Sequence, residues 1–119
     1  METRELGRFG EERAARWLRL HGYRILETNY ACRLGEIDLI ARRGRYLVFV
    51  EVKLRKNANF AAAREFVTAA KQQRIRSTAA LYLSQNETEL QPRFDVIEIY
   101  APDGADGKVT IKHIENAFE

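Results

Sequence analysis

The 119-residue sequence contains little cysteine and no long apolar run. Its single cysteine, Cys32, excludes an internal disulfide and a metal cluster built from several cysteines. We expect a reducing compartment, the cytoplasm, because proteins there rarely use disulfides. No apolar run exceeds five residues, as in Tyr46–Val50, whereas a membrane-spanning helix needs about 20. The N-terminal residues METRELGRFGEER lack an apolar core, so we expect neither a secretory signal nor a membrane partner.

The composition is that of a folded chain. Hydrophobic residues make up 45% of the sequence, which excludes an intrinsically disordered protein. Domains usually have about 100–150 residues, so we expect one domain spanning residues 1–119. A chain of this length buries roughly two-thirds of the surface that its unfolded form exposes, which is enough for one core.

Basic residues are concentrated in the first two-thirds of the chain. Residues 1–80 carry 17 basic and 9 acidic side chains, whereas residues 81–119 carry 3 and 8. Arginine supplies 15 of the 20 basic groups, and its planar guanidinium suits bidentate contacts with phosphate. This asymmetry fits an anionic partner such as nucleic acid, and it fits an arginine-rich solvated surface equally well.

The hydrophobic pattern predicts the order α-β-β-β-α-β-β, typical of an α/β fold in which helices flank a mixed β-sheet. A Gly-containing turn at residues 42–45 indicates a hairpin, and residues 57–61 read as a loop. The expected elements are a helix over 5–21, strands over Tyr23–Tyr30, Gly35–Ala41 and Tyr46–Leu54, a helix over Ala62–Leu83, and strands over Arg93–Tyr100 and Lys108–Ile114 followed by a short helical turn.

Two charged residues end the most apolar strand. Tyr46–Leu54 is apolar on both faces, which is typical of a central strand covered on both sides. Glu51 and Lys53 nevertheless lie two residues apart on one face of it. Burying such charges is costly unless they pair or bind a metal. A lone Glu-x-Lys triplet is a weak signal, because a cross-strand ion pair explains it as well.

The expected strand Gly35–Ala41 also carries charged residues on one face, since Glu36 and Asp38 share it. If the central residues of the hairpin turn are Arg43-Gly44, Asp38 lies opposite Phe49, and a longer turn places Asp38 directly opposite Glu51. In both registers Asp38 and Glu51 share a face. Two carboxylates this close repel each other, and a hard divalent ion such as Mg²⁺ would relieve the repulsion. Glu36, near the start of its strand, could instead be solvated.

The helices add two further candidates. Glu11 falls on a stripe with small and apolar residues, whereas Glu12 lies among arginines, so we assign Glu11 rather than Glu12 to the site. Glu11 could also simply complement the helix dipole. Lys71 lies within the buried stripe of the second helix. It either extends its ammonium to solvent or points toward the acidic residues or a phosphate.

Arginines precede and follow these strands. Arg42, Arg43 and Arg45 crowd the hairpin turn, while Arg33 precedes one strand and Arg55 follows Lys53. They could bind the phosphates of a nucleic-acid backbone or form an ordinary charged turn.

Six segments spread over nearly the whole sequence form a recognisable combination. They are Gly7-x-x-Gly10-Glu11, Asn29-Tyr30, Gly35–Ile40, Phe49–Lys53 with Arg55, Val67 with Lys71, and Arg93–Val96. Together they resemble the YraN-like family of small bacterial proteins. This resemblance implies a restriction-endonuclease-like fold similar to that of archaeal Holliday-junction resolvases. The family's motif, an Asp, a Glu-x-Lys one strand later and often a Glu in the first helix, maps to Asp38, Glu51, Lys53 and Glu11.

The resemblance implies a metal-dependent endonuclease that hydrolyses phosphodiester bonds of DNA, including branched DNA. Mg²⁺ or Mn²⁺ would be held by Asp38, Glu51, Glu11 and the main-chain carbonyl of Val52. Lys53 would orient a water or stabilise developing charge, and Glu36 would assist. A homodimer would suit the cutting of two strands. The residues expected to bind nucleic acid are Arg33, Arg43, Arg45, Arg55 and Lys71.

Two alternatives remain at this point. The same fold could serve as a non-catalytic nucleic-acid-binding or adaptor module, with the acids in structural ion pairs. It could also be a metal-regulated protein-interaction domain.

Overall fold

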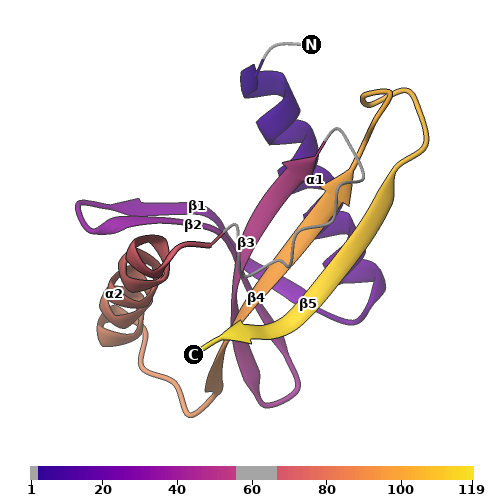
Figure 1. The fold of residues 1–119 in the computed structure, drawn as a ribbon. Helices are drawn as coiled ribbons and strands as arrows, with labels where there is room; N and C mark the ends of the chain where they lie inside the picture. The colour runs from indigo at the N-terminus through magenta and orange to yellow at the C-terminus, as the bar shows by residue number, and fades with distance from the viewer. Residues whose placement is uncertain (1–2, 56–66) are drawn as a thin grey trace.

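The computed structural model describes residues 3–55 and 67–119. Two helices and five strands follow one another in the predicted order (Figure 1). They are α1 (Thr3–Leu20), β1 (Arg24–Cys32), β2 (Gly35–Arg43), β3 (Tyr46–Arg55), α2 (Ala69–Gln85), β4 (Gln91–Tyr100) and β5 (Thr110–Phe118). No helix within the described ranges is long and apolar enough to span a membrane.

The strands form one mixed sheet in the order β1-β2-β3-β4-β5. Strands β3 and β4 are parallel, and every other neighbouring pair is antiparallel. The chain leaves β3 and returns to β4 through α2, as a parallel pair requires. The prediction of an α/β fold with a mixed sheet and flanking helices is therefore confirmed.

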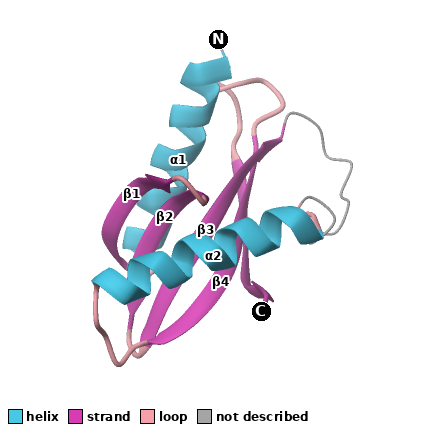
Figure 2. Cartoon of the chain, turned by 90° about the vertical axis from the view of Figure 1, so that its left-hand side faces the viewer, coloured by secondary structure: helices cyan, strands magenta, loops and turns pink. Residues whose placement is uncertain are grey.

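The two helices cover opposite faces of the sheet. Leu18 of α1 packs in one core cluster with Val48 and Val50 of β3. Ile75 of α2 packs in the other cluster with Phe49, whose side chain points to the opposite face of the same strand. This double cover explains why β3 is apolar on both faces. Figure 2 shows α2 lying across its face of the sheet.

The end of α1 is fixed by a left-handed glycine. Gly22 has φ of 87°, and the N–H of Tyr23 donates to the carbonyl of Leu18 at 2.9 Å. This bond closes a Schellman motif, which ends the helix and turns the chain toward β1. The side chain of Tyr23 is thereby buried between α1 and the sheet.

Two predicted boundaries differ from the structure by more than two residues. Helix α2 begins at Ala69 rather than Ala62, with Thr68 as its N-cap, whose hydroxyl accepts from the N–H of Lys71 at 3.2 Å. Residues 57–61, predicted as a loop, and the predicted helical segment 62–66 lie outside the described residues. Strand β5 continues to Phe118, so the prediction of a helical turn there was wrong. Phe118 pairs with Phe94, and their rings stack at 5.1 Å.

The β2–β3 hairpin is tight, but its turn is centred one residue later than expected. Arg43 pairs with Tyr46 across Gly44-Arg45, and Leu39 pairs with Val50. The register that placed Asp38 opposite Phe49 was therefore wrong. Extending the observed register by one residue places Asp38 opposite Glu51, so a two-residue turn is sufficient for this pairing.

Candidate active site

A pocket of about 200 Å³ opens where the beginning of β2, the middle of β3 and the first turns of α2 meet. Asp38 and Glu51 lie on the α2 side of the sheet, and α2 adds Lys71. This arrangement brings together residues that are separated by up to 40 positions in the sequence. The lining residues are Gly35, Glu36, Asp38, Glu51, Lys71, Arg74 and Ile75.

Asp38 is held by the main chain of β3. Its Oδ2 accepts a hydrogen bond from the N–H of Val52 at 2.8 Å. Burial and the negative charge of Glu51 nevertheless raise the pKa of Asp38 from 3.8 to about 7, with smaller contributions from Glu11 and Glu36. The hydrogen bond from Val52 opposes this rise without cancelling it. The surroundings of Asp38 therefore favour its neutral, protonated form over the charged form.

Three carboxylates converge beside β2. One oxygen each from Glu11, Glu36 and Asp38 lies within 4.8 Å of the other two. Glu11 is half-buried while its neighbour Glu12 is exposed, which agrees with the helical stripe that selected Glu11. No ion pair between described residues involves any of these three acids. Carboxylate oxygens are the ligands that Mg²⁺ and Mn²⁺ prefer, so this group is chemically suited to a hard divalent cation.

Glu51 is engaged by two lysines rather than by the other acids. Its Oε1 lies 2.5 Å from Nζ of Lys71 and 3.6 Å from Nζ of Lys53. Burial lowers the pKa of Lys53, and the nearby Lys71 lowers it further. Burial alone would also lower the pKa of Lys71, but the hydrogen bond to Glu51, the contact with Lys53 and the negative charges of Glu51 and Asp38 together outweigh burial and raise that pKa. Of the two orientations considered for Lys71, the structure shows the one directed at the acidic residues.

The arginines predicted to bind nucleic acid do not gather around the pocket. Arg33 lies in the β1–β2 turn just before Gly35, and Arg55 follows Lys53 on β3. Arg43 and Arg45 occupy the β2–β3 turn, five or more residues from Asp38 and thus roughly 16 Å away along the strand. There each guanidinium lies over a tyrosine ring, Arg43 over Tyr23 and Arg45 over Tyr46.

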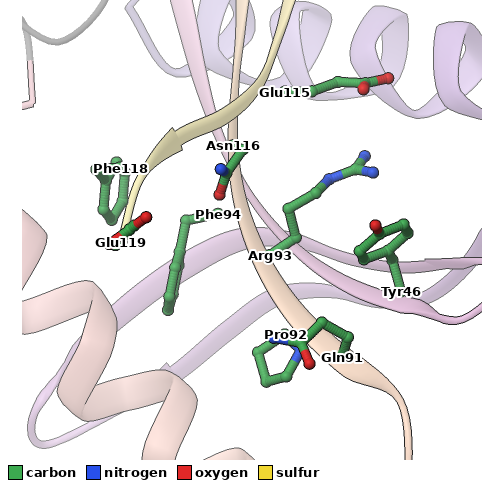
Figure 3. Close-up of a pocket in the computed structure, with 9 residues that line it drawn as sticks. All are labelled: Tyr46, Gln91, Pro92, Arg93, Phe94, Glu115, Asn116, Phe118 and Glu119. Atoms are coloured by element: carbon green, nitrogen blue, oxygen red, sulfur yellow. The ribbon is translucent and has the colours of Figure 1, made fainter.

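A larger pocket, of about 640 Å³, lies at the opposite end of the sheet. Figure 3 shows Phe94 and Phe118 on one side of it and Arg93 and Tyr46 on the other. Arg93 does not leave its charge available there, because it donates two hydrogen bonds to Asp95, at 2.9 and 2.8 Å. Arg93 and Asp95 form this ion pair on β4, an internal strand of the sheet.

Two buried titratable residues of β4 and β5 are missing from the candidates selected from the sequence. His113 lies with its Nε2 2.7 Å from Asp95, and its side chain is largely buried. Glu98 interrupts the apolar segment Val96–Tyr100, and only 1% of it is exposed. Both were missed because the sequence does not show which residues of neighbouring strands face one another.

The raised pKa of Asp38 leads to a pH-dependent prediction. An acid whose pKa rises on folding destabilises the folded state above its unfolded pKa. In a chelator, Asp38→Asn should therefore leave the unfolding free energy almost unchanged near pH 4. The variant should gain stability between pH 4 and 7 and be roughly 2–4 kcal/mol more stable at pH 8. The amide oxygen can still accept from Val52, so the comparison isolates the charge.

Urea unfolding from pH 4 to 8 would measure this gain. Asp106→Asn makes the same chemical change at an exposed position and should show no such trend. A difference between Asp38→Asn and wild type that does not vary with pH would contradict the assigned pKa.

Comparisons with known proteins identify a family. The family model described as "Uncharacterised protein family UPF0102" matches residues 10–99. A UPF0102 protein of Symbiobacterium thermophilum is 47% identical over 117 residues, which cover 98% of each chain. One from Caldanaerobacter subterraneus subsp. tengcongensis is 45% identical over 99% of this chain and 98% of its own. One from Pelobacter propionicus is 46% identical over 99% of this chain and 85% of its own.

Proposed function

The chain belongs to the UPF0102 family, the YraN-like family that its motifs resemble, and we propose that it is a metal-dependent nuclease acting on DNA. The observation that carries the proposal is the convergence of the Glu11, Glu36 and Asp38 carboxylates at the edge of the pocket where Glu51 pairs with Lys53 and Lys71. Acidic residues next to an ammonium group suit metal-dependent phosphodiester hydrolysis. The acids can bind a divalent cation, and the ammonium can donate a hydrogen bond to the phosphate oxygen on which negative charge develops.

The acidic residues fit a divalent cation. Asp38, Glu11 and Glu36 offer oxygens close together, and burial, with the negative charge of Glu51 and to a smaller extent of Glu11 and Glu36, raises the pKa of Asp38. These residues would hold Mg²⁺ or Mn²⁺, and Glu51 in the adjoining pocket would add a fourth carboxylate. The ion would lower the pKa of a bound water and neutralise charge on the phosphate. A further ligand from the Val52 carbonyl stays a prediction; it is the N–H of Val52 that contacts Asp38.

The lysines would act on the phosphate. Lys53 and Lys71 both lie at one oxygen of Glu51, which lines the acidic pocket, so two ammonium groups lie close to it. A phosphate drawn to the pocket would meet two positive charges that stabilise the charge developing on its oxygens. Arg33 and Arg55, at the ends of the two site strands, would contact neighbouring backbone phosphates without reading the bases.

The topology supports the restriction-endonuclease-like assignment. A helix supplies Glu11, the second strand supplies Asp38, and the third strand supplies Glu51 and Lys53, which is the order of the family motif. Strand β4 then joins parallel to β3 through α2, so the site lies on a mixed sheet covered on both faces. Action on branched DNA and a homodimeric assembly are part of the same proposal.

One observation favours the non-catalytic alternative. Glu51 is already neutralised by Lys53 and Lys71, as a structural ion pair would be. In that case the fold would bind nucleic acid through its basic surface without cleaving it.

The direct test is a cleavage screen of the purified protein. Duplex, flap, single-stranded and four-way-junction DNA would each be incubated with Mg²⁺, Mn²⁺ or a chelator. We expect cleavage of at least one substrate that the chelator abolishes. Binding without cleavage of any substrate would favour the adaptor alternative. DNA binding should in either case weaken as salt rises, because phosphate contacts release counterions.

A further inference from the structure

Next to Lys53 lies a buried carboxylate that has one oxygen without a partner. Glu98 is only 1% exposed. Its Oε2 accepts a hydrogen bond from the hydroxyl of Tyr100 at 2.6 Å and lies 3.8 Å from Nε of Arg55. Among the described residues, no donor reaches its Oε1. A buried polar atom in this state costs free energy, so it requires an explanation.

Lys53 is the neighbour that could supply the donor. It pairs with Glu98 in the parallel register of β3 and β4, so the two side chains lie on the same face of the sheet. Phe49 and Phe94, paired in the same register, show this directly because their rings stack at 5.6 Å. Neighbouring strands lie about 4.8 Å apart, a gap that a lysine side chain spans easily.

Lys53 is also the weaker of the two partners of Glu51. Its Nζ lies 3.6 Å from Oε1 of Glu51, whereas Nζ of Lys71 lies 2.5 Å from the same atom. Two ammonium groups at one oxygen repel each other. Lys53 therefore has two carboxylates as neighbours: Glu51, which it shares with Lys71, and Glu98, whose Oε1 accepts no hydrogen bond from a described residue.

We propose that Glu98 is a positioning residue whose Oε1 provides a second docking point for the Lys53 ammonium. Lys53 moves to this point when Glu51 loses its charge or turns to another cation. With a metal ion bound, Glu51 would turn away from its lysines, and Glu98 would then hold the Lys53 ammonium in position. This consequence for catalysis rests on the proposed function. The pairing of Lys53 with Glu98 does not depend on any metal.

A second lysine could compete for the same oxygen. Lys112 of β5 pairs with Glu98 across the antiparallel register, so it lies on the same face. Its side chain is exposed, and no ion pair among described residues joins it to Glu98. Lys112 therefore provides the matched control for Lys53.

Double-mutant cycles in chelator test the proposal without metal or DNA. The coupling between Lys53→Met and Glu98→Gln would be measured by urea unfolding, first in the wild type and then in a Glu51→Gln background. We expect little coupling in the wild type and about a fivefold effect on the unfolding constant in the Glu51→Gln background. Coupling that does not increase there, or an equal increase for Lys112→Met with Glu98→Gln, would overturn the proposal.

A spectroscopic measurement covers the possibility that Glu51→Gln does not fold. Glu51→Asp keeps the charge but withdraws the carboxylate by one methylene. We expect this change to shift the NMR signal of the Lys53 Cε methylene, and Glu98→Gln to remove most of that shift. A shift of equal size with and without the Glu98 carboxylate would contradict the second docking point. Because neither measurement uses cleavage, a protein that lacks nuclease activity would still test this inference.

Discussion

Lys53→Ala is expected to lower the rate of metal-dependent DNA cleavage by about 10²–10³-fold. The ammonium of Lys53 lies 3.6 Å from Glu51 in the acidic pocket, where it would stabilise charge that develops only in the transition state. Such a loss appears in kcat more than in KM. Asp38→Ala removes a carboxylate of the proposed cation site and should lower the rate by at least as much. DNA binding should stay nearly constant in both variants, because the exposed arginines are untouched.

Single-turnover cleavage and DNA-binding titrations would be compared for the same proteins. Lys112→Ala removes an exposed lysine from β5 and provides the control for Lys53, with an expected rate near that of the wild type. Cleavage by Lys53→Ala at the wild-type rate would exclude the assigned role of this lysine. Equal losses of binding and cleavage would indicate that Lys53 only holds the substrate.

Asp95→Ala is expected to have the largest effect on stability, about 3–5 kcal/mol. Asp95 is fully buried and accepts hydrogen bonds from Arg93, from His113 at 2.7 Å and from the N–H of Asn116 at 3.0 Å. Removing the carboxylate leaves the Arg93 guanidinium, 11% exposed, without its counter-charge. A buried unpaired cation costs much more than the net value of the pair.

The pH dependence of the wild type gives a second readout for Asp95. Burial alone would raise its pKa, but the hydrogen bonds from His113, Arg93 and the N–H of Asn116, together with the positive charge of Arg93, outweigh burial and lower it below 3.8. An acid whose pKa falls on folding stabilises the protein above its unfolded pKa. The stability contributed by Asp95 should therefore be present above about pH 4 and be lost as the pH falls further.

Urea unfolding at pH 7 would measure the loss in Asp95→Ala. Glu115→Ala removes an exposed carboxylate that lines the same large pocket and should change stability by less than about 1 kcal/mol. A loss of similar size in both variants would show that the Asp95 network contributes little.

The fold class followed from the sequence because its signals are local. Alternation of apolar residues identified the strands, and the apolar character of both faces of β3 indicated cover on both sides. The start of α2 was missed because alanines at residues 61–63 suit a helix by propensity alone. The end of β5 was missed because Phe118 is fixed by stacking on Phe94, a contact between residues 24 positions apart.

The acidic residues of the site could be selected from the sequence, but their grouping could not. Periodicity placed Asp38, Glu51 and Lys53 on one face and Glu11 on the inner side of α1. The structure adds that Glu51 pairs with Lys71, whereas Asp38 lies with Glu11 and Glu36. That division depends on where α2 crosses the sheet. The tertiary arrangement also places Glu98 beside Lys53 and separates Arg43 and Arg45 from the pocket.

The central claim is that the carboxylates beside β2 bind a divalent cation, and calorimetric titration with Mn²⁺ tests it most directly. Wild-type protein and Asp106→Asn should bind Mn²⁺ saturably and with equal affinity, and Asp38→Asn should bind at least about tenfold more weakly. Failure of the wild type to bind Mn²⁺, or equal affinity in Asp38→Asn, would contradict the account.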